Sequence, residues 1–137
     1  MTTARDVMTA DVEILGVDDT ARTAAERMAR SDIGALPVCG EDRRLVGVVT
    51  DRDIVLEVVA RGQDPDSVQV GTLAQGEAVT IGADDSLDEA RRTMAEHQVK
   101  RLPVIDGRQL VGIVSLADVA QTGEDTQTGQ TVQDITG

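Results

Sequence analysis

Two patterns of apolar and polar positions run along the chain, and each occurs twice. In residues 21–28 and 87–94, apolar side chains return every three or four positions, which is the spacing of an amphipathic helix. The first of these segments precedes two short apolar runs, at 36–39 and 45–49, and the second precedes their counterparts. Short apolar runs separated by polar turns indicate strands. The sequence therefore predicts two copies of a helix followed by a hairpin.

The two copies keep an almost constant register. Pro37 and Pro103 are 66 positions apart, whereas Asp53 and Asp118 are 65 positions apart. The missing position falls in the hairpin turn, which is long and polar at 40–44 and shrinks to an Asp-Gly signal in the second copy. An internal repeat of this kind usually means two copies of one supersecondary unit.

We therefore expect a first repeat over residues 1–65 and a second over 66–121. Residues 63–75, with a Pro-containing turn signal, are expected to connect the two copies. The remaining residues, 122–137, are rich in Gly, Thr and Gln and contain few apolar side chains, which is typical of a flexible tail. A segment that binds a partner is the alternative for this tail.

Polar residues mark where the helices begin. Thr20 precedes the first amphipathic helix and Ser86 precedes the second, where Glu89 adds the spacing of a capping box. A Thr-x-x-Asp motif at 50–53 recurs as Ser-x-x-Asp in the second copy, and each motif is expected to open a further helix. We expect the first of these helices to end at Gly62.

The hairpin strands carry two further signals. Pro37 indicates that the strand over 36–39 is an edge strand or a strand start, because Pro cannot donate to a ladder. The run at 45–49 has no polar alternation, so we expect it to be buried on both faces. Gly47 within that run indicates that another segment passes close to its backbone.

Composition and charge exclude several classes of function. The 137 residues include no Phe, Trp or Tyr, so the core must be aliphatic, and the net charge is −12. A field of that sign repels nucleic acid and anionic membrane surfaces, and no apolar run reaches the length of a membrane span. A single cysteine cannot form an internal disulfide and is typical of a reducing compartment. We therefore expect a cytoplasmic protein with neither nucleic-acid nor membrane partners.

The single cysteine and the single histidine offer little chemistry. Cys39 ends a predicted strand and is expected to be a buried apolar residue, with a redox role as the alternative. His97 has no second His or Cys nearby, so it is expected at a surface or a helix end. The sequence therefore predicts no metal site, no catalytic residue and no enzyme activity.

Taken together, these motifs resemble a cystathionine-β-synthase (CBS) domain pair, also called a Bateman module. The resemblance covers about residues 5–120. It rests on four features: DVMT at 6–9, IGALPV at 33–38, LVGVVTDRDI at 45–54, and their second-copy counterparts. It implies an α/β (α+β) fold of two pseudo-symmetric β-α-β-β-α units packed sheet to sheet. It also implies two clefts between the units and a disk-shaped homodimer formed through helices.

The resemblance implies that the repeated Thr/Ser-x-x-Asp motif holds the ribose of an adenosine ligand. Its residues are Thr50, Asp53, Ser115 and Asp118. A fixed carboxylate offers acceptors for two neighbouring hydroxyls. The same spacing is also that of a helix N-terminal cap, which needs no ligand, and both roles can hold at once.

Three basic residues are candidates for binding a ligand phosphate: Arg52, Lys100 and Arg101. The two copies differ at these positions, because Ala117 corresponds to Arg52, and Gly34 and Ala35 correspond to the other two. Solvated surface charges are the alternative. The asymmetry predicts that the two clefts differ and that at most one is a good nucleotide site.

The first strand of each hairpin would form the wall of the cleft against the base. These residues are Gly34, Ala35, Leu36, Pro37, Val38, Leu102, Pro103 and Val104. No aromatic side chain is present to stack on a base. For most of these side chains a plain core position is the favoured interpretation.

These features lead to two hypotheses for function. The first is a stand-alone, non-enzymatic regulatory module without a cofactor, which binds AMP, ADP or ATP between the repeats and signals energy state to a partner protein. The second is a ligand-free interaction or structural dimer with a role in a stress response. Loss of a cation at position 117 and the acidic charge favour the second.

Overall fold

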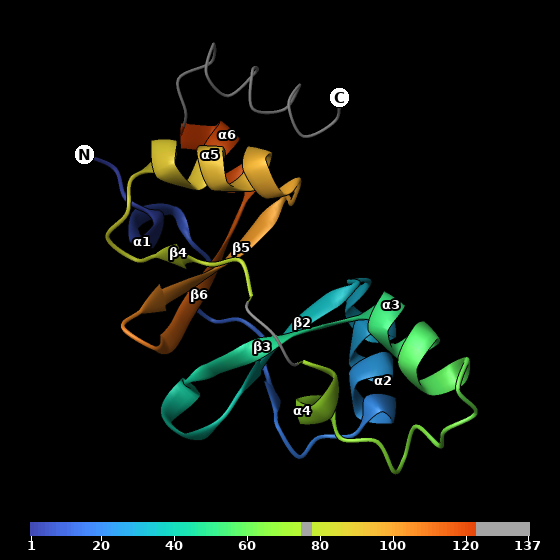
Figure 1. Cartoon of the computed structure of the whole chain (residues 1–137). Coiled ribbons are helices and arrows are strands. Elements are labelled where there is room, and N and C mark those ends of the chain that lie inside the picture. The colour runs from blue at the N-terminus through green and yellow to red at the C-terminus, as the bar shows by residue number, and fades with distance from the viewer. Residues whose placement is uncertain (75–77, 123–137) are drawn as a thin grey trace. The chain divides into compact units, whose positions relative to one another are not determined.

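The computed structural model describes residues 1–74 and 78–122 as a mixed α/β structure with two three-stranded sheets (Figure 1). The chain divides into two compact units. We call Glu13–Ala78 the first unit, and Met1–Val12 together with the chain from Val79 onward the second unit. The predicted fold class is confirmed, whereas nearly all of the predicted tail lies outside the described residues.

The first unit contains a sheet in the order β1-β2-β3, with β1 parallel and β3 antiparallel to β2. Its strands are β1 (Leu15–Gly16), β2 (Ala35–Cys39) and β3 (Leu45–Thr50). Its helical segments are α2 (Ala21–Ser31), the 3₁₀ turn η1 (Glu41–Arg43), α3 (Asp51–Ile54), the π-helical turn η2 (Val55–Val59) and α4 (Val70–Leu73). Helix α4 lies within the segment that the sequence predicts to be a connector.

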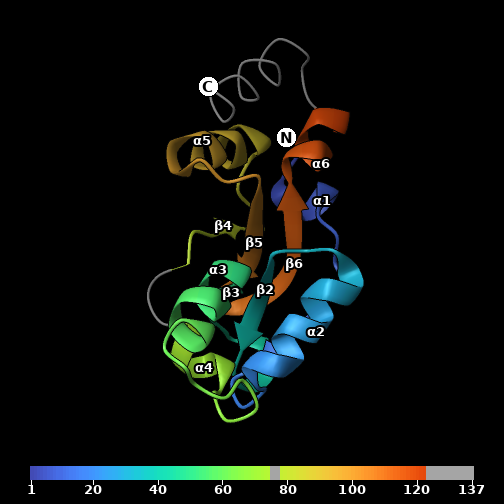
Figure 2. The same cartoon turned by 90° about the vertical axis from the view of Figure 1, so that its right-hand side faces the viewer.

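The second unit repeats this plan with a sheet in the order β4-β5-β6. Its strands are β4 (Ile81–Gly82), β5 (Arg101–Asp106) and β6 (Gln109–Ser115). Its helices are α1 (Ala4–Val7), α5 (Leu87–His97) and α6 (Leu116–Thr122). Figure 2 shows α6 continuing from the end of β6, with α1 beside both elements.

Each unit includes one short helix that is distant in sequence from its hairpin. In the second unit, Thr9 and Ile113 exchange two backbone hydrogen bonds (2.8 and 2.9 Å), which hold the α1 segment against β6. In the first unit, the Val70 N–H donates to the Asp19 carbonyl (2.8 Å) at the start of α4. The first compact unit therefore includes residues 66–78 of the predicted second repeat. The second compact unit includes residues 1–12 of the predicted first repeat. Where one sequence repeat ends and the next begins stays a prediction.

Two glycines allow these short helices to approach the sheets. A Cβ on Gly47 would lie 2.2 Å from the carbonyl oxygen of Ala74, just after α4. A Cβ on Gly112 would lie 2.6 Å from Sδ of Met8 and 2.7 Å from the carbonyl oxygen of Thr9. Such distances leave no room for a side chain, so the close approach predicted at Gly47 is confirmed and its counterpart behaves alike.

Each unit has its own aliphatic core, in agreement with the absence of aromatic residues. The first core consists of Leu15, Ala21, Ala24, Met28, Leu36, Val38, Val49, Ile54, Val58, Val70 and Ala74. The second consists of Ala4, Ile81, Ala83, Ala90, Met94, Leu102, Val104, Val114 and Val119. Both amphipathic helices bury most of the stripe that the sequence predicts, including the equivalent Met28 and Met94, while Ala25 and Leu87 are partly buried.

Two predictions about the first hairpin are wrong. Strand β2 lies in the centre of its sheet and Pro37 is its third residue, so Pro37 marks neither an edge strand nor a strand start. Pro37 is tolerated because β1 pairs only with Val38 and Cys39. Strand β3 is not buried on both faces, since Val46 is 41% exposed while Val49 is buried. An unbroken apolar run can therefore still alternate between the core and the surface.

The helix starts agree with the sequence, with one exception. The Thr20 hydroxyl accepts from the backbone N–H of Thr23, and the Ser86 hydroxyl accepts from that of Glu89 (3.1 Å each). The Glu89 carboxylate accepts from Nη2 of Arg92 (2.6 Å), so the capping box predicted at Ser86 is only half formed. The left-handed Gly62, at φ +69°, follows η2 where the sequence predicts the helix to end.

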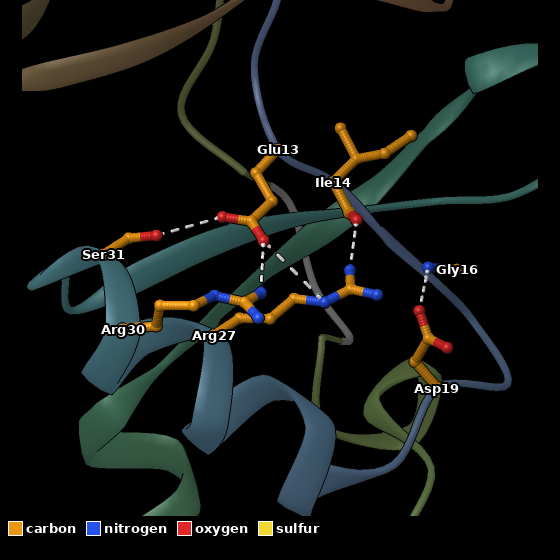
Figure 3. A network of polar contacts seen from close by, with 7 residues as sticks. All are labelled: Glu13, Ile14, Gly16, Asp19, Arg27, Arg30 and Ser31. Atoms are coloured by element: carbon orange, nitrogen blue, oxygen red, sulfur yellow. Dashed lines mark hydrogen bonds and ion pairs between the residues drawn. The ribbon is translucent and has the colours of Figure 1, made fainter.

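A charged cluster joins the segment before β1 to helix α2 (Figure 3). The Glu13 carboxylate lies 3.4 Å from Nη2 of Arg30 and accepts from the Ser31 hydroxyl at 3.2 Å. Arg27 lies 3.8 Å from the same carboxylate and donates to the carbonyl of Ile14 at 2.8 Å. This cluster holds the start of the first unit against its helix.

Candidate functional site

Each hairpin leads into its helix through a reciprocal cap. The Asp53 N–H donates to the Thr50 hydroxyl (3.1 Å), and the Thr50 N–H donates to the Asp53 carboxylate (2.9 Å). Ser115 and Asp118 form the same pair of bonds at 3.1 and 2.8 Å. The capping interpretation is therefore confirmed in both copies. All four residues are half-buried, so the caps border solvent.

A third capping carboxylate lies outside the repeated Thr/Ser-x-x-Asp motif. At the start of α1, the backbone N–H and the hydroxyl of Thr3 both donate to the Asp6 carboxylate (2.8 and 3.1 Å). These hydrogen bonds, that of the backbone first, lower the pKa of Asp6. Asp6 therefore serves as a reference for a capping carboxylate outside the repeated motif.

The backbone brings the start of the hairpin beside its end. In the first unit, Ala35 pairs with Thr50 in the ladder, and the Asp51 N–H donates to the Gly34 carbonyl (2.9 Å). We call Gly34, Ala35 and Thr50 to Asp53 the first half-site. The structure therefore gathers the ribose candidates and the start of the predicted wall within one unit.

The second unit gathers the equivalent residues in the same way. Arg101 pairs with Ser115, and the Leu116 N–H donates to the Lys100 carbonyl (2.8 Å). We call Lys100, Arg101 and Ser115 to Asp118 the second half-site. Its two cations are exposed, as is Arg52 in the first half-site, so all three phosphate candidates reach solvent.

The two half-sites carry opposite charge. The first contains two carboxylates and one guanidinium, from Asp51, Arg52 and Asp53. The second contains two cations and one carboxylate, from Lys100, Arg101 and Asp118. The second is therefore the better electrostatic match for a phosphate.

Asp51 is a residue that the sequence reasoning missed. Its Oδ2 lies 3.0 Å from the position that a Cβ of Gly34 would take, and its Oδ1 accepts from the N–H of Arg52 (2.8 Å). A carboxylate therefore lies against Gly34, where the predicted wall would let a ligand meet the backbone. The only sequence signal is the difference between Asp51 and its counterpart Leu116.

Most of the predicted wall belongs to the two cores. The buried members are Leu36, Pro37, Val38, Leu102, Pro103 and Val104. The core interpretation favoured for these side chains is confirmed, while the half-buried Gly34 and the exposed Ala35 remain at the surface. Base contacts from this strand stay a prediction.

The remaining candidates behave as the sequence indicates. Cys39 is buried, and burial raises the pKa of its thiol, so the buried apolar interpretation is confirmed. His97 is the exposed last residue of α5. Within residues 1–74 and 78–122, no group of three or more His, Cys, Asp or Glu side chains is placed to hold a metal ion. In the same part of the chain, every helix is too short or too polar to cross a membrane.

Comparison with known proteins gives a consistent result. The CBS domain model matches residues 4–60 and 70–124. Hypoxic response protein 1 of Mycobacterium tuberculosis is 49% identical over 121 residues, which cover 88% of this chain and 85% of that protein. Such a likeness to hypoxic response proteins is what the opening residues TTARDVM and the run at 32–55 predict, and it is confirmed.

Two solved structures extend the comparison. The crystal structure of hypoxic response protein I with two coordinated zinc ions has a TM-score of 0.81 at 48% identity, and the match covers 89% of this chain and 99% of that chain. The structure of CBSX2 in complex with AMP has a TM-score of 0.74 at 26% identity and covers 88% of this chain and 94% of that chain.

Proposed function

This chain belongs to the CBS-domain family, and on that premise we propose that it is a cytoplasmic regulatory module, without catalytic activity, that binds an adenosine-containing nucleotide. Two copies would form a homodimer, and a partner protein would respond to the bound state. The observation that carries the proposal is the pair of capped carboxylates, Asp53 and Asp118, held with the same geometry in both units. The AMP bound to the related CBSX2 supports the choice of ligand.

The caps suit these carboxylates to a ribose. Asp53 accepts the Thr50 N–H through Oδ2, and its Oδ1 has no hydrogen bond to any other described residue. A carboxylate that is already fixed loses little conformational entropy when hydroxyls bind to it. Within the second half-site, Lys100 and Arg101 would attract the phosphate of a nucleotide whose ribose Asp118 holds.

Regulation requires that the ligand distinguish two arrangements of the protein. A nucleotide shifts such an equilibrium only by its differential affinity for the two states. AMP, ADP and ATP differ in phosphate charge, and the clustered cations of the second half-site provide a basis for telling them apart. Sensing of energy state would follow from that discrimination.

The zinc ions of the related crystal structure are not part of this proposal. Zinc prefers Cys and His ligands, and the chain has one of each. Cys39 is buried in strand β2 of the first unit, whereas His97 is exposed at the end of α5 in the second. The described residues therefore do not offer a zinc donor set of their own.

Thermal unfolding in the presence of AMP, ADP and ATP tests the proposal. Circular dichroism is the suitable readout because the chain has no Trp or Tyr. A nucleotide at ~100 times its dissociation constant should stabilise the protein by ~2.7 kcal/mol, a shift of several degrees. No shift with any nucleotide at millimolar concentration would leave the ligand-free interaction dimer as the better interpretation.

Variants separate ribose binding from capping. In Asp53→Asn and Asp118→Asn, the amide oxygen can still accept the capping N–H but offers hydroxyls fewer acceptors. We expect nucleotide affinity to fall about tenfold, the loss of one charge-assisted hydrogen bond. Asp6→Asn changes the same kind of cap at α1 and should leave affinity unchanged. Equal affinity in all three variants and the wild type would exclude the ribose assignment.

A further inference from the structure

The first residues of the chain meet the sheet of the second unit through a methionine. We call residues 1–12 the N-terminal segment, and Figure 2 shows its helix α1 beside β6. A Cβ on Gly112 of β6 would lie 2.6 Å from Sδ of Met8 and 2.9 Å from its Cγ, so the thioether lies directly over the Gly112 backbone. Met8 is half-buried and packs against the second core. It is therefore part of the packing and yet partly open to solvent.

The other three methionines of the chain do not combine these two properties. Met28 and Met94 lie in the two cores and are only 6% and 0% exposed. Met1 is 92% exposed, so its side chain contributes little to packing. An oxidant in solution reaches an exposed thioether more readily than a buried one, and a sulfoxide disrupts packing only where the side chain packs. Met8 is therefore the methionine at which oxidation would change the structure.

A sulfoxide at Met8 would put a polar oxygen where the neighbouring backbone groups are already paired. The N–H and carbonyl groups of Thr9 and Ile113 bond to each other at 2.8 and 2.9 Å. The Thr9 carbonyl oxygen also lies 2.7 Å from the position of a Gly112 Cβ, so an acceptor already occupies this space. An added atom would overpack the contact, and a buried oxygen without a donor is unfavourable. The oxidised side chain would therefore leave β6.

The N-terminal segment depends on the packing that this change would remove. Helix α1 has four residues, so its stability comes from packing and not from helix propensity. Met8 is its C-terminal cap and directly precedes Thr9, whose two bonds with Ile113 hold the segment against β6. Displacement of Met8 would therefore also pull on these two hydrogen bonds.

We propose that Met8 is a site of reversible oxidation by hydrogen peroxide, and that its oxidation releases the N-terminal segment from β6. In this step the O–O bond of the peroxide breaks and one oxygen joins Sδ as a sulfoxide. The other oxygen leaves with both protons as water. The sulfur loses two electrons and the peroxide gains them. Enzymatic reduction of methionine sulfoxide would return the segment to its place.

The first unit has no sulfur at the equivalent contact. At an offset of 66 the counterpart of Met8 is Ala74, whose carbonyl oxygen faces Gly47. Peroxide should therefore loosen the second unit and leave the first unchanged. Strand β6 ends at Ser115, two residues after Ile113, so release of the segment would also loosen the second half-site. This last step rests on the proposed function.

Hydrogen-exchange mass spectrometry of the full chain, before and after treatment with hydrogen peroxide, tests the release. We expect sulfoxide at Met1 and Met8 well before the two buried methionines. Amide exchange over residues 1–12 and 109–115 should become about tenfold faster, because a misplaced polar group opposes packing by a free energy of that order. Exchange in β3 should not change. Oxidation of Met8 as slow as that of the buried methionines, or a sulfoxide at Met8 without faster exchange, would overturn the proposal.

Two matched variants and one reversal assign the effect to Met8. Met8→Leu keeps an apolar side chain of similar size but has no thioether, so peroxide should no longer change the exchange of the N-terminal segment. Met94→Leu makes the same substitution in the second core and should keep the wild-type response. Treatment of the oxidised wild type with a methionine sulfoxide reductase should restore slow exchange. A response that persists in Met8→Leu, or after Met8 has been reduced, would contradict the assignment.

The readouts also separate this proposal from the proposed function. Hydrogen exchange is measured without nucleotide, so release of the segment is decided whether or not the chain binds AMP. Calorimetric titration then tests the second half-site, where oxidation of the wild type should weaken AMP binding about fivefold and leave that of Met8→Leu unchanged. Faster exchange with unchanged AMP affinity would contradict this last step alone. Untreated protein that binds no nucleotide would contradict the proposed function.

Discussion

Asp51 in the first unit and Leu116 in the second occupy equivalent positions, one residue after the hydroxyl of a reciprocal cap. The first is an exposed carboxylate that lies against Gly34, whereas the second packs partly buried against its core. The same contrast continues next to them, where Arg52 corresponds to Ala117. The caps are the same in both units, so the side chains around each cap, rather than the cap itself, decide what each half-site can bind.

Hydrogen bonds and close contacts that hold the backbone in place occur in both units. Asp19 and Asp85 each accept the N–H of a strand residue, Gly16 or Gly82, at 2.8 and 2.9 Å. Each unit also has a glycine that allows its short helix, α4 or α1, to approach the sheet. The Glu13 cluster of Figure 3, in contrast, belongs to the first unit, since Val79 stands at the equivalent position. The two units therefore share a scaffold and differ in their charged surface.

The largest expected effect tests the shared scaffold. Gly47→Ala and Gly112→Ala should each destabilise the protein by about 3 kcal/mol, because the new methyl group would collide with neighbouring backbone. Gly40→Ala is the control, since its nearest neighbour, a methyl group of Val46, would be at an ordinary 3.7 Å. Urea unfolding followed by circular dichroism measures all three. A Gly47→Ala variant as stable as the control would show that α4 does not pack against β3 in this way.

The charged cluster around Glu13 predicts a smaller loss of stability, and it predicts this loss for a substitution in the first unit but not for its counterpart in the second. Arg27→Ala removes the hydrogen bond to Ile14 and the ion pair with Glu13, and should cost about 1.5 kcal/mol. The counterpart Thr93 bonds to the Glu89 carbonyl of its own helix, so Thr93→Ala should change stability by less than about 0.5 kcal/mol. The same unfolding experiment measures both variants. Equal losses would contradict the difference between the units.

The smallest effect concerns Asp51. Asp51→Leu gives the first half-site the residue of the second and removes a negative charge from beside the proposed ligand. Because the group is exposed and screened, the affinity for AMP should rise only about twofold, and that for uncharged adenosine should not change. Titration calorimetry with both ligands measures this. Leu116→Asp should weaken AMP binding, and a rise there would reverse the assignment.

The sequence predicts those parts of the fold that local chemistry determines. The caps at Thr20 and Thr50 and the helix stop at Gly62 depend on residues within a few positions of each other. Gly47 could be recognised because a glycine inside an apolar strand often marks the close approach of another backbone segment.

The remaining features depend on contacts between distant segments. Helix α4 has only four residues, so its stability comes from packing against β3 and not from helix propensity. The central place of β2 depends on a two-residue strand, β1, which is too short to recognise from a pattern. The approach of Asp51 to Gly34 likewise becomes visible only once the hairpin has closed.

The central claim is that the two units bind phosphate unequally, and calorimetric titration of AMP tests it most directly. Wild-type protein should bind AMP saturably. Lys100→Ala and Arg101→Ala should each weaken AMP binding about tenfold, and Arg52→Ala should weaken it less. Adenosine binding should be unchanged in all three variants. Equal losses from the two half-sites, or full AMP affinity without Lys100 and Arg101, would contradict the account.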